Sequence, residues 1–393
     1  MEQPILGGKD KWDSVFLFSG RPVPAMLDMA RYAQMNGLRT LVIILDRGVN
    51  DVLIDQALVK FEVITIPVDY TTVSLRRLLS FPAVYWQINR IVRDGLARDG
   101  VIFSASYDLL AIARLLCVGR KFRLRHQVRD LHRLQLGRSA KSRVLAALEK
   151  LMLRRAEMLI VSAPGFFEHY YVRFFSKRVV LLENTPARST WLGFRKEPRE
   201  GRPFRIGFVG IVRYKQSLRQ LIEAVERLAG EGMAIDIMFA GGGLPEDLEL
   251  LRSAPSIVRF CGPYEYTRDI KRLYSTVDLI YSVYDNADQN CQIAMPNKFY
   301  EAIIAKIPIV VASRTYVAAE VQRLGIGTAV ESGDVEGLIS LLRRVATVGD
   351  WYDRAVVQLD ATSAEYFFSA YERALADSIM PIAHEDSCGG KKA

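Results

Sequence analysis

The chain has 393 residues, 50% of them hydrophobic, and a net charge of +9; this length can fill more than one core, so two α/β domains of about 150–200 residues each are expected. Its four cysteines are scattered without a CxxC pair, which argues against a zinc site and against a disulfide framework. The first residues lack the pattern of a secretory signal and no apolar run approaches the ~20 residues of a spanning helix, so we expect a cytoplasmic protein that does not cross a membrane.

Apolar runs of strand length alternate with helical patterns through the first half of the chain. The runs are rich in β-branched and aromatic residues and end at glycine, proline or charged residues, as buried strands do. Such alternation is typical of parallel βαβ units, so we predict a Rossmann-like N-terminal domain. The predicted strands are residues 14–20, 39–47, 60–68, 100–106, 122–130, 157–163 and 179–186, with helices at 24–37, at 107–116 and from about 139.

Positive charge is concentrated in one segment of this half. Residues 120–155 hold twelve Lys and Arg against two Asp and Glu, a net charge of +10, and the rest of the chain is close to neutral. A helix capped by Ser139 is predicted within the segment, with one apolar and one basic face. This basic face is either merely solvated or attracts anionic lipid, at roughly 1 kcal/mol per basic residue. The apolar face is Leu145, Leu148, Met152 and Leu159, and the basic face is Arg143, Lys150 and Arg154.

Glycines, prolines and charges break the alternation at residues 189–204, where we place a linker. A second α/β pattern follows it, and the residues from Ala383 onward are polar and glycine-bearing, as disordered tails are. The predicted organisation is an N-terminal domain at 1–190, a linker at 191–203, a second Rossmann-like domain at 204–362, a C-terminal helix at 363–381 that crosses back to the N-terminal domain and a disordered tail at 382–393.

The second domain opens with the buried strand RIGFVG, which ends at Gly210. Arg213 and Lys215 follow in the turn before an amphipathic helix. Ligands of open α/β sheets gather at the carboxyl edge of the strands, so two cations here would compensate a pyrophosphate. They would also stabilise the negative charge on a departing nucleoside diphosphate.

Two further features of this domain suit a nucleotide. The strand AIDIMFA closes on Gly241 and Gly242, which is weak evidence because many strand-to-helix turns need glycine. The segment NKFYEAIIAKIPIVVAS, residues 297–313, predicts a short helix followed by a strand that is buried on both faces. Glu301 lies one turn into that helix, where a carboxylate can take both hydroxyls of a ribose.

Five blocks in this order resemble the C-terminal half of GT-B glycosyltransferases, most closely the large retaining group called family 4, or glycosyl transferases group 1. The blocks are FVGIVRYKQSLRQLIEAVERL, MFAGGG, VRFCGPYEYTRDIKRLYSTVDLIYSVY, PNKFYEAIIAKIPIVVAS and GIGTAVESGDVEGLISLL. The resemblance implies two Rossmann-like domains that face each other across a cleft. It also implies that Arg213 and Lys215 meet the donor diphosphate and that Glu301 binds the ribose.

The chain departs from the family at Ile293, where a glutamate usually touches the donor sugar. Asn297 and Lys298 are candidates to take over part of the phosphate or sugar contact. The nucleotide base, the sugar and the stereochemistry therefore stay open.

In the first half, the resemblance implies candidates on the acceptor side of the cleft. Gly20 ends the first strand, where family members approach donor or acceptor with backbone, although a βα turn with proline is common in any fold. Arg129 and Asp130 resemble a pair that follows an N-domain strand of the family. Asp130 would remove the proton of the acceptor hydroxyl if the enzyme inverts, or bind a sugar if it retains. His132 follows closely and is a weaker candidate.

The leading expectation is a glycosyltransferase that moves a sugar from a nucleoside diphosphate sugar to a lipid-linked or surface glycan, as in bacterial exopolysaccharide or cell-envelope polysaccharide biosynthesis. It needs no metal cofactor, because cationic side chains supply the charge. The basic segment is expected to hold it peripherally on the cytoplasmic face of the plasma membrane. A nucleotide-sugar 2-epimerase of the same fold is the alternative. A non-catalytic nucleic-acid binder is less favoured, because the basic segment has, apart from its two histidines, a single aromatic ring, Phe122, for base stacking.

Overall fold

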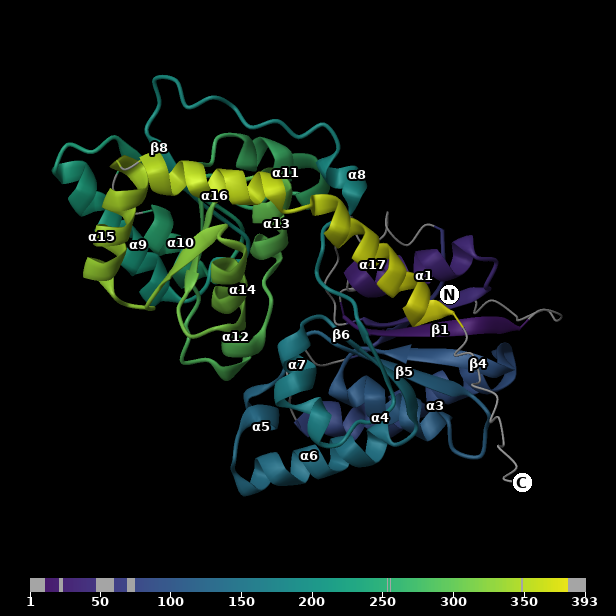
Figure 1. The fold of residues 1–393 in the computed structure, drawn as a ribbon. Coiled ribbons are helices and arrows are strands. Elements are labelled where there is room, and N and C mark those ends of the chain that lie inside the picture. Colours follow the sequence, from purple (N-terminus) through teal and green to yellow (C-terminus); the bar gives the residue numbers. More distant parts are fainter. Residues whose placement is uncertain are drawn as a thin grey trace, which may run out of the picture.

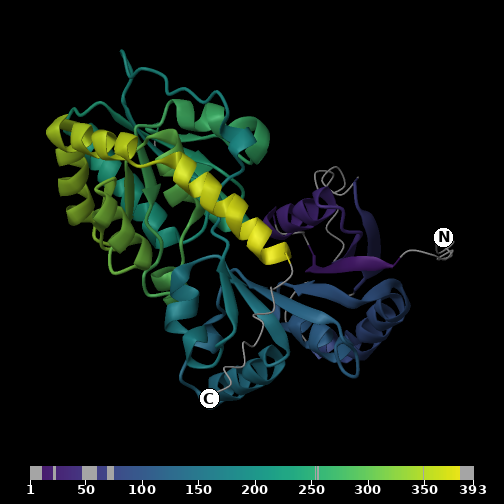
Figure 2. The same cartoon turned by 45° about the vertical axis from the view of Figure 1, so that its right-hand side comes forward.

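The structure is a computed structural model that describes residues 11–20, 24–46, 60–68, 75–252, 254, 256–347 and 349–380. The tail predicted at 382–393 and the residues Arg21–Val23 after Gly20 lie outside this description. The described chain forms two α/β domains, and a C-terminal helix runs from the second domain onto the first (Figures 1 and 2).

In the described part of the chain, the N-terminal sheet has seven parallel strands in the order β3-β2-β1-β4-β5-β6-β7. The chain starts in the middle of the sheet, winds to one edge and then to the other, so the sheet is doubly wound. Its central strands are buried on both faces, as their continuous apolar runs predict. The strands are Trp12–Ser19 (β1), Thr40–Asp46 (β2), Glu62–Pro67 (β3), Leu96–Ser104 (β4), Arg123–Val128 (β5), Ala156–Val161 (β6) and Arg178–Leu181 (β7).

Helices cover both faces of this sheet (Figure 1). The longest, Leu75–Gly95 (α3), was not assigned from the sequence, although Val84, Ile88 and Val92 are buried at helical spacing. The other helices are Pro24–Met35 (α1), Tyr107–Leu116 (α4), Arg133–Leu136 (α5), Ala140–Leu153 (α6), Pro164–His169 (α7) and Arg188–Trp191 (α8), with a 3-10 turn at Tyr171–Arg173 (η1).

The helix predicted in the basic segment is confirmed as α6, and Ser139 caps it by accepting a hydrogen bond from the Ser142 backbone N–H at 3.1 Å. Its predicted apolar face is wrong. Leu159 lies in β6, and Leu148 is 49% exposed.

The buried face of α6 is set by a polar cluster instead. Glu149 is buried, and its carboxylate accepts hydrogen bonds from the hydroxyls of Tyr170 and Tyr171, both at 2.7 Å, and from the Gln135 amide at 3.0 Å. Burial raises the pKa of Glu149, and these three donors oppose the shift. Of the predicted apolar face, Leu148 is exposed, together with Val144 and Leu151, which the prediction had not included.

Among the described residues, the second sheet has six parallel strands in the order β10-β9-β8-β11-β12-β13. It is wound in the same double manner, with helices on both faces. The strands are Phe204–Val209 (β8), Ile235–Ala240 (β9), Val258–Phe260 (β10), Leu279–Ser282 (β11), Ile309–Ala312 (β12) and Gly327–Val330 (β13). The helices are Lys215–Gly230 (α9), Pro245–Arg252 (α10), Tyr266–Ser275 (α11), Gln289–Ile293 (α12), Asn297–Ala305 (α13), Tyr316–Leu324 (α14) and Val335–Thr347 (α15).

The chain then crosses back to the first domain. Gly349–Ala361 (α16) lies along the second domain, and Ala364–Ile379 (α17) packs on α1 and β7 (Figures 1 and 2). The fully buried Arg125 side chain of β5 fixes the end of α17 by donating to the carbonyl oxygens of Ser378 and Met380. The predicted two-domain α/β fold with a returning C-terminal helix is confirmed. No described helix combines the length and the apolar character that a membrane crossing requires.

Candidate functional site

A cavity of about 860 Å³ lies at the carboxyl ends of the strands of both sheets. From the first domain, it receives the segments that follow β5, β6 and β7. From the second, it receives those that follow β8, β9, β11 and β12. This is the edge at which doubly wound sheets bind ligands. The predicted site residues that line it are Arg129, Asp130, Gly210, Arg213, Gly241, Gly242, Asn297, Lys298 and Glu301.

Three predicted site residues are not among those that line the cavity. Gly20 directly follows β1 with a φ of 81° and donates its backbone N–H to the Leu45 carbonyl. His132 is exposed and caps α5, where its Nδ1 accepts from the Leu134 backbone N–H at 3.2 Å. Lys215 is half-buried at the first position of α9. Their roles in the reaction stay predictions that the cavity does not support.

Glu301 is buried beneath the cavity on α13, 3% exposed. The Tyr266 hydroxyl donates to its Oε1 at 2.9 Å and the Tyr274 hydroxyl donates to its Oε2 at 2.7 Å. Burial raises the pKa of Glu301, and Lys298 and the two tyrosines oppose this shift. Because each carboxylate oxygen can accept two hydrogen bonds, the tyrosines orient the group and leave it able to accept two ribose hydroxyls.

Lys298 brings a buried cation to the end of β8. Its Nζ lies 4.5 Å from the centre of the Phe208 ring and donates to the Tyr284 hydroxyl at 2.9 Å. A Cβ built on Gly210 would lie 2.8 Å from this Nζ, so the amine touches the turn predicted to meet phosphate. An ammonium in this position can compensate a diphosphate.

Arg213 is a second cation at the cavity, held over the ring of Tyr214 at 5.0 Å. Tyr214 has a φ of 66°, in the left-handed region that bulky side chains rarely adopt. This conformation costs roughly 1–3 kcal/mol, and such strain is concentrated at functional sites. The Tyr214 hydroxyl also meets the Cys291 sulfur at 3.3 Å, so the turn is tied to α12.

The glycines after β8 and β9 allow two backbone segments to touch. Gly210 and Gly241 have φ values of 143° and 151°, and a Cβ on Gly241 would lie 1.7 Å from the Gly210 carbonyl oxygen. A Cβ on Gly243 would lie 2.5 Å from the Val212 oxygen, whereas one on Gly242 would meet no atom within 4 Å. Gly241 is therefore required by packing, and Gly242 exposes backbone to the cavity.

Asp130 is met from the opposite domain, by a residue that the sequence analysis missed. The Asn290 amide of α12 donates to Asp130 Oδ1 at 3.0 Å and its oxygen accepts from the Leu131 backbone N–H at 2.8 Å. A five-residue helix gives no periodic signal, and a contact between domains leaves no local pattern in the sequence. A second residue that was missed is Ser282 at the end of β11, whose buried hydroxyl lines the cavity without a hydrogen-bond partner among the described residues.

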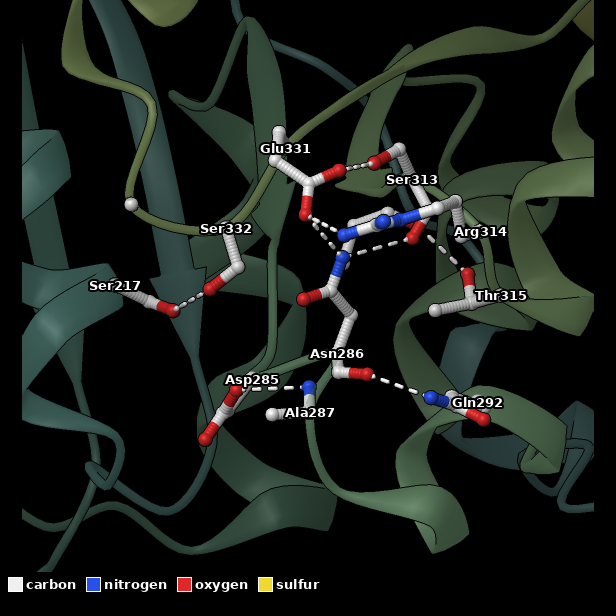
Figure 3. Close-up of polar contacts among 12 residues, drawn as sticks. Ser217, Asp285, Asn286, Ala287, Gln292, Ser313, Arg314, Thr315, Glu331 and Ser332 are labelled. Atoms are coloured by element: carbon white, nitrogen blue, oxygen red, sulfur yellow. Dashed lines mark hydrogen bonds and ion pairs between the residues drawn. The ribbon is translucent and has the colours of Figure 1, made fainter.

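The loop between β11 and α12 is fastened to the ends of two neighbouring strands (Figure 3). The Asn286 amide donates to Glu331 Oε1 at 2.9 Å and to the Ser313 carbonyl at 3.2 Å. Glu331 also accepts from the Ser313 hydroxyl and from Arg314, and these donors lower its pKa, with the hydroxyl contributing most. The Gln292 amide then returns to the Asn286 carbonyl at 2.9 Å.

Residues 203–347 match the family described as glycosyl transferases group 1. This match covers the second domain and less than half of the chain. A relative also matches: the succinoglycan biosynthesis protein ExoL of Rhizobium meliloti (strain 1021) is 28% identical over 262 residues. That match covers 62% of this chain and 64% of ExoL, so it spans slightly less than two thirds of the relative.

Solved structures that resemble the whole chain share its GT-B architecture. Anabaena HepE in complex with UDP has a TM-score of 0.69 at 14% identity, over 93% of this chain and all of HepE. A UDP-N-acetylglucosamine 2-epimerase has a TM-score of 0.62 at 14% identity, over 94% of this chain and 95% of the epimerase. At these identities the likeness shows the fold alone. The resemblance to GT-B glycosyltransferases and to glycosyl transferases group 1 is confirmed for the fold and for the second domain.

Proposed function

We propose that the protein is a glycosyltransferase that moves a sugar from a nucleoside diphosphate sugar to a hydroxyl of a lipid-linked or surface glycan. The observation that carries this proposal is the convergence of Glu301 and Lys298 from one domain with Asp130 from the other on one cavity. ExoL is named for succinoglycan biosynthesis, which supports an acceptor in exopolysaccharide or cell-envelope polysaccharide synthesis.

Each side of the cavity has a chemical task in this proposal. Glu301 accepts the ribose hydroxyls, and Lys298 and Arg213 compensate the diphosphate at the N-terminus of α13, whose dipole favours an anion. As the sugar–phosphate bond breaks, the same cations stabilise the charge that develops on the leaving group. Asp130 meets the acceptor hydroxyl, as a base if the reaction inverts and as a binding group if it retains.

A screen of UDP-, GDP- and dTDP-sugars for protection from thermal unfolding tests the donor half of this proposal. A donor at one hundred times its dissociation constant is expected to stabilise the protein by about 2.7 kcal/mol, which raises the midpoint by several degrees. The protecting donor should then transfer its sugar to a membrane glycolipid fraction. Failure of every donor to protect, at concentrations that saturate other sugar-nucleotide enzymes, would contradict the proposal. Isomerisation of the free donor without acceptor would instead establish the 2-epimerase alternative.

We propose that turnover needs no metal, because Lys298 and Arg213 offer two positive charges where the diphosphate is expected. Chelation with EDTA should leave the transfer rate unchanged within about twofold, since charge stabilisation by fixed side chains does not depend on a dissociable ion. A rate that EDTA abolishes and Mg²⁺ or Mn²⁺ restores would show that a cation takes part. Lys298→Met should lower the rate both with and without EDTA.

We also propose that α6 docks the protein on the anionic cytoplasmic face of the plasma membrane. Val144, Leu148 and Leu151 are 61%, 49% and 52% exposed and form one stripe at helical spacing. The basic residues predicted to share a face, Arg143, Lys150 and Arg154, are exposed beside it. An apolar stripe flanked by basic side chains is the arrangement of helices that lie in a membrane interface.

Sedimentation with phosphatidylglycerol vesicles should pellet the protein at low salt and release part of it at high salt, because screening shortens the reach of surface charge to about 3 Å at 1 M salt. Changing Arg143, Lys150 and Arg154 together to Glu should abolish binding. The matched control changes three exposed arginines of the second domain, Arg219, Arg259 and Arg354, to Glu and should still bind. Equal partition onto neutral and anionic vesicles would show α6 to be a solvated face.

A further inference from the structure

We infer that Asn290 is a positioning residue that holds Asp130 from across the cleft, so that the acceptor side of the site is complete only when the two domains are closed. The inference rests on the proposed function for the role of Asp130. The contact itself is independent of that role. Asn290 contributes both polar atoms of its amide, one to the Asp130 carboxylate and one to the Leu131 backbone N–H.

Asp130 needs such support because of where it lies. It follows β5 in a segment that belongs to neither a helix nor a strand, and its side chain is exposed. A hydrogen bond to one carboxylate oxygen fixes the rotation of the carboxylate. The second oxygen can then accept a hydrogen bond from the hydroxyl of the acceptor substrate in a defined direction. The hydrogen bond from the Leu131 backbone N–H fixes the backbone directly after Asp130.

Asn290 is itself held rigidly by the second domain. The Asp288 side chain caps α12 by accepting from the Asn290 backbone N–H at 2.9 Å. In the loop before α12, the Asn286 amide donates hydrogen bonds to Glu331 and to the Ser313 carbonyl at the end of β12 (Figure 3). The amide that reaches Asp130 is therefore anchored to the carboxyl ends of β12 and β13, and it moves with the donor domain.

Close packing shows that α12 sits firmly against the first domain. It contacts α5 and α7, and a Cβ on Gly165 of α7 would lie only 2.4 Å from the Ile293 carbonyl oxygen. Ile293 stands where the family has a glutamate for the donor sugar, and here this turn lies against the opposite domain. The chain thus uses α12 as a contact between domains that reaches the acceptor carboxylate. Such an arrangement would limit hydrolysis of the donor while the cleft is open to water.

Hydrogen–deuterium exchange of the full-length protein without ligand tests the bridge directly. In Asn290→Ala the Leu131 amide loses its acceptor and should exchange at least tenfold faster, whereas Gln289→Ala, an exposed neighbour on the same helix, should leave it unchanged. Unchanged exchange in Asn290→Ala would overturn the inference. This result does not depend on any activity, so it separates the inference from the proposed function.

A double-mutant cycle on transfer, with the donor that protects the wild type, tests positioning. Asn290→Ala should lower kcat by about 10- to 150-fold, the range for a hydrogen bond to a charged group, with the affinity for the nucleoside diphosphate within twofold of wild type. Asn290→Ala should then add little to Asp130→Ala, because both remove the same function. Fully multiplicative losses, or a kcat equal to that of Gln289→Ala, would overturn the positioning role.

Discussion

Replacing Glu301 with glutamine is expected to weaken binding of the nucleoside diphosphate by ~1.5–3 kcal/mol, or about 10- to 150-fold, the range for hydrogen bonds to a charged group. The amide keeps the shape of the side chain, so the fold should be retained, but it offers one acceptor oxygen in place of two. It also leaves Lys298 without its neighbouring negative charge. Isothermal titration calorimetry with the protecting nucleotide measures the loss. Affinity equal to wild type would remove Glu301 from the ribose site.

The pH dependence gives this prediction a second measurement. Burial raises the pKa of Glu301 above the ordinary value of 4.5. Its contribution to folding stability is therefore full below the unfolded pKa and is lost as the pH rises through the raised, folded value. Donor binding has the opposite sign, because ribose hydroxyls need the ionised carboxylate: affinity should fall as the pH is lowered through the raised pKa. Glu301→Gln should flatten this dependence. Tyr274→Phe is a matched variant that keeps the carboxylate, and with it the pH dependence.

Gly241→Ala is expected to cost several kcal/mol of folding stability, the largest loss among the glycine substitutions at the cavity. Its methyl group would overlap the Gly210 carbonyl oxygen at 1.7 Å, and its φ of 151° disfavours any side chain. Overpacking costs about 1–3 kcal/mol and a strained backbone roughly 1–3 kcal/mol more. The oxygen belongs to the backbone and the backbone also fixes the position of the Cβ, so no side-chain rotation can relieve the overlap.

Gly242→Ala is the control for this substitution, because its Cβ would meet no atom within 4 Å. Chemical denaturation should show a midpoint close to wild type for Gly242→Ala and a strongly lowered one for Gly241→Ala. Equal midpoints would mean that the two turns separate in solution. A loss of nucleotide affinity in Gly242→Ala without loss of stability would place the ligand against this glycine.

The fold could largely be predicted because buried parallel strands have a strong local signal. Runs such as residues 41–45 are apolar throughout, and both sheets follow from such runs. The faces of α6 could not be predicted in this way. Glu149 is tolerated inside because it accepts hydrogen bonds from three side chains, and none of them belongs to its own helix. Periodicity reports hydrophobicity, and it cannot show where a carboxylate finds partners.

The residues of the candidate site also fall into a group that the sequence predicts and a group that it does not. Residues tied to a strand end or to a helix start, such as Arg213, Lys298 and Glu301, line the cavity, because sheet topology brings those positions together. Asn290, Tyr266 and Tyr274 act through side chains that meet a partner far along the chain. Lys215 is only two residues from Arg213, yet it is absent from the lining, because Arg213 lies in the turn after β8 whereas Lys215 already belongs to α9.

The returning helix α17 would keep the two domains associated even after the chain between them is cut. The backbone passes between the domains twice, once before β8 and once before α17. With the two domains joined at two crossings, their relative motion is a hinge rotation about the line that joins the crossings. A protease that cuts the exposed segment near Arg199 would therefore not release either half. The fragments would stay associated, because Arg125 grips the end of α17 and the Tyr371 hydroxyl donates to Asp28 of α1 at 2.9 Å.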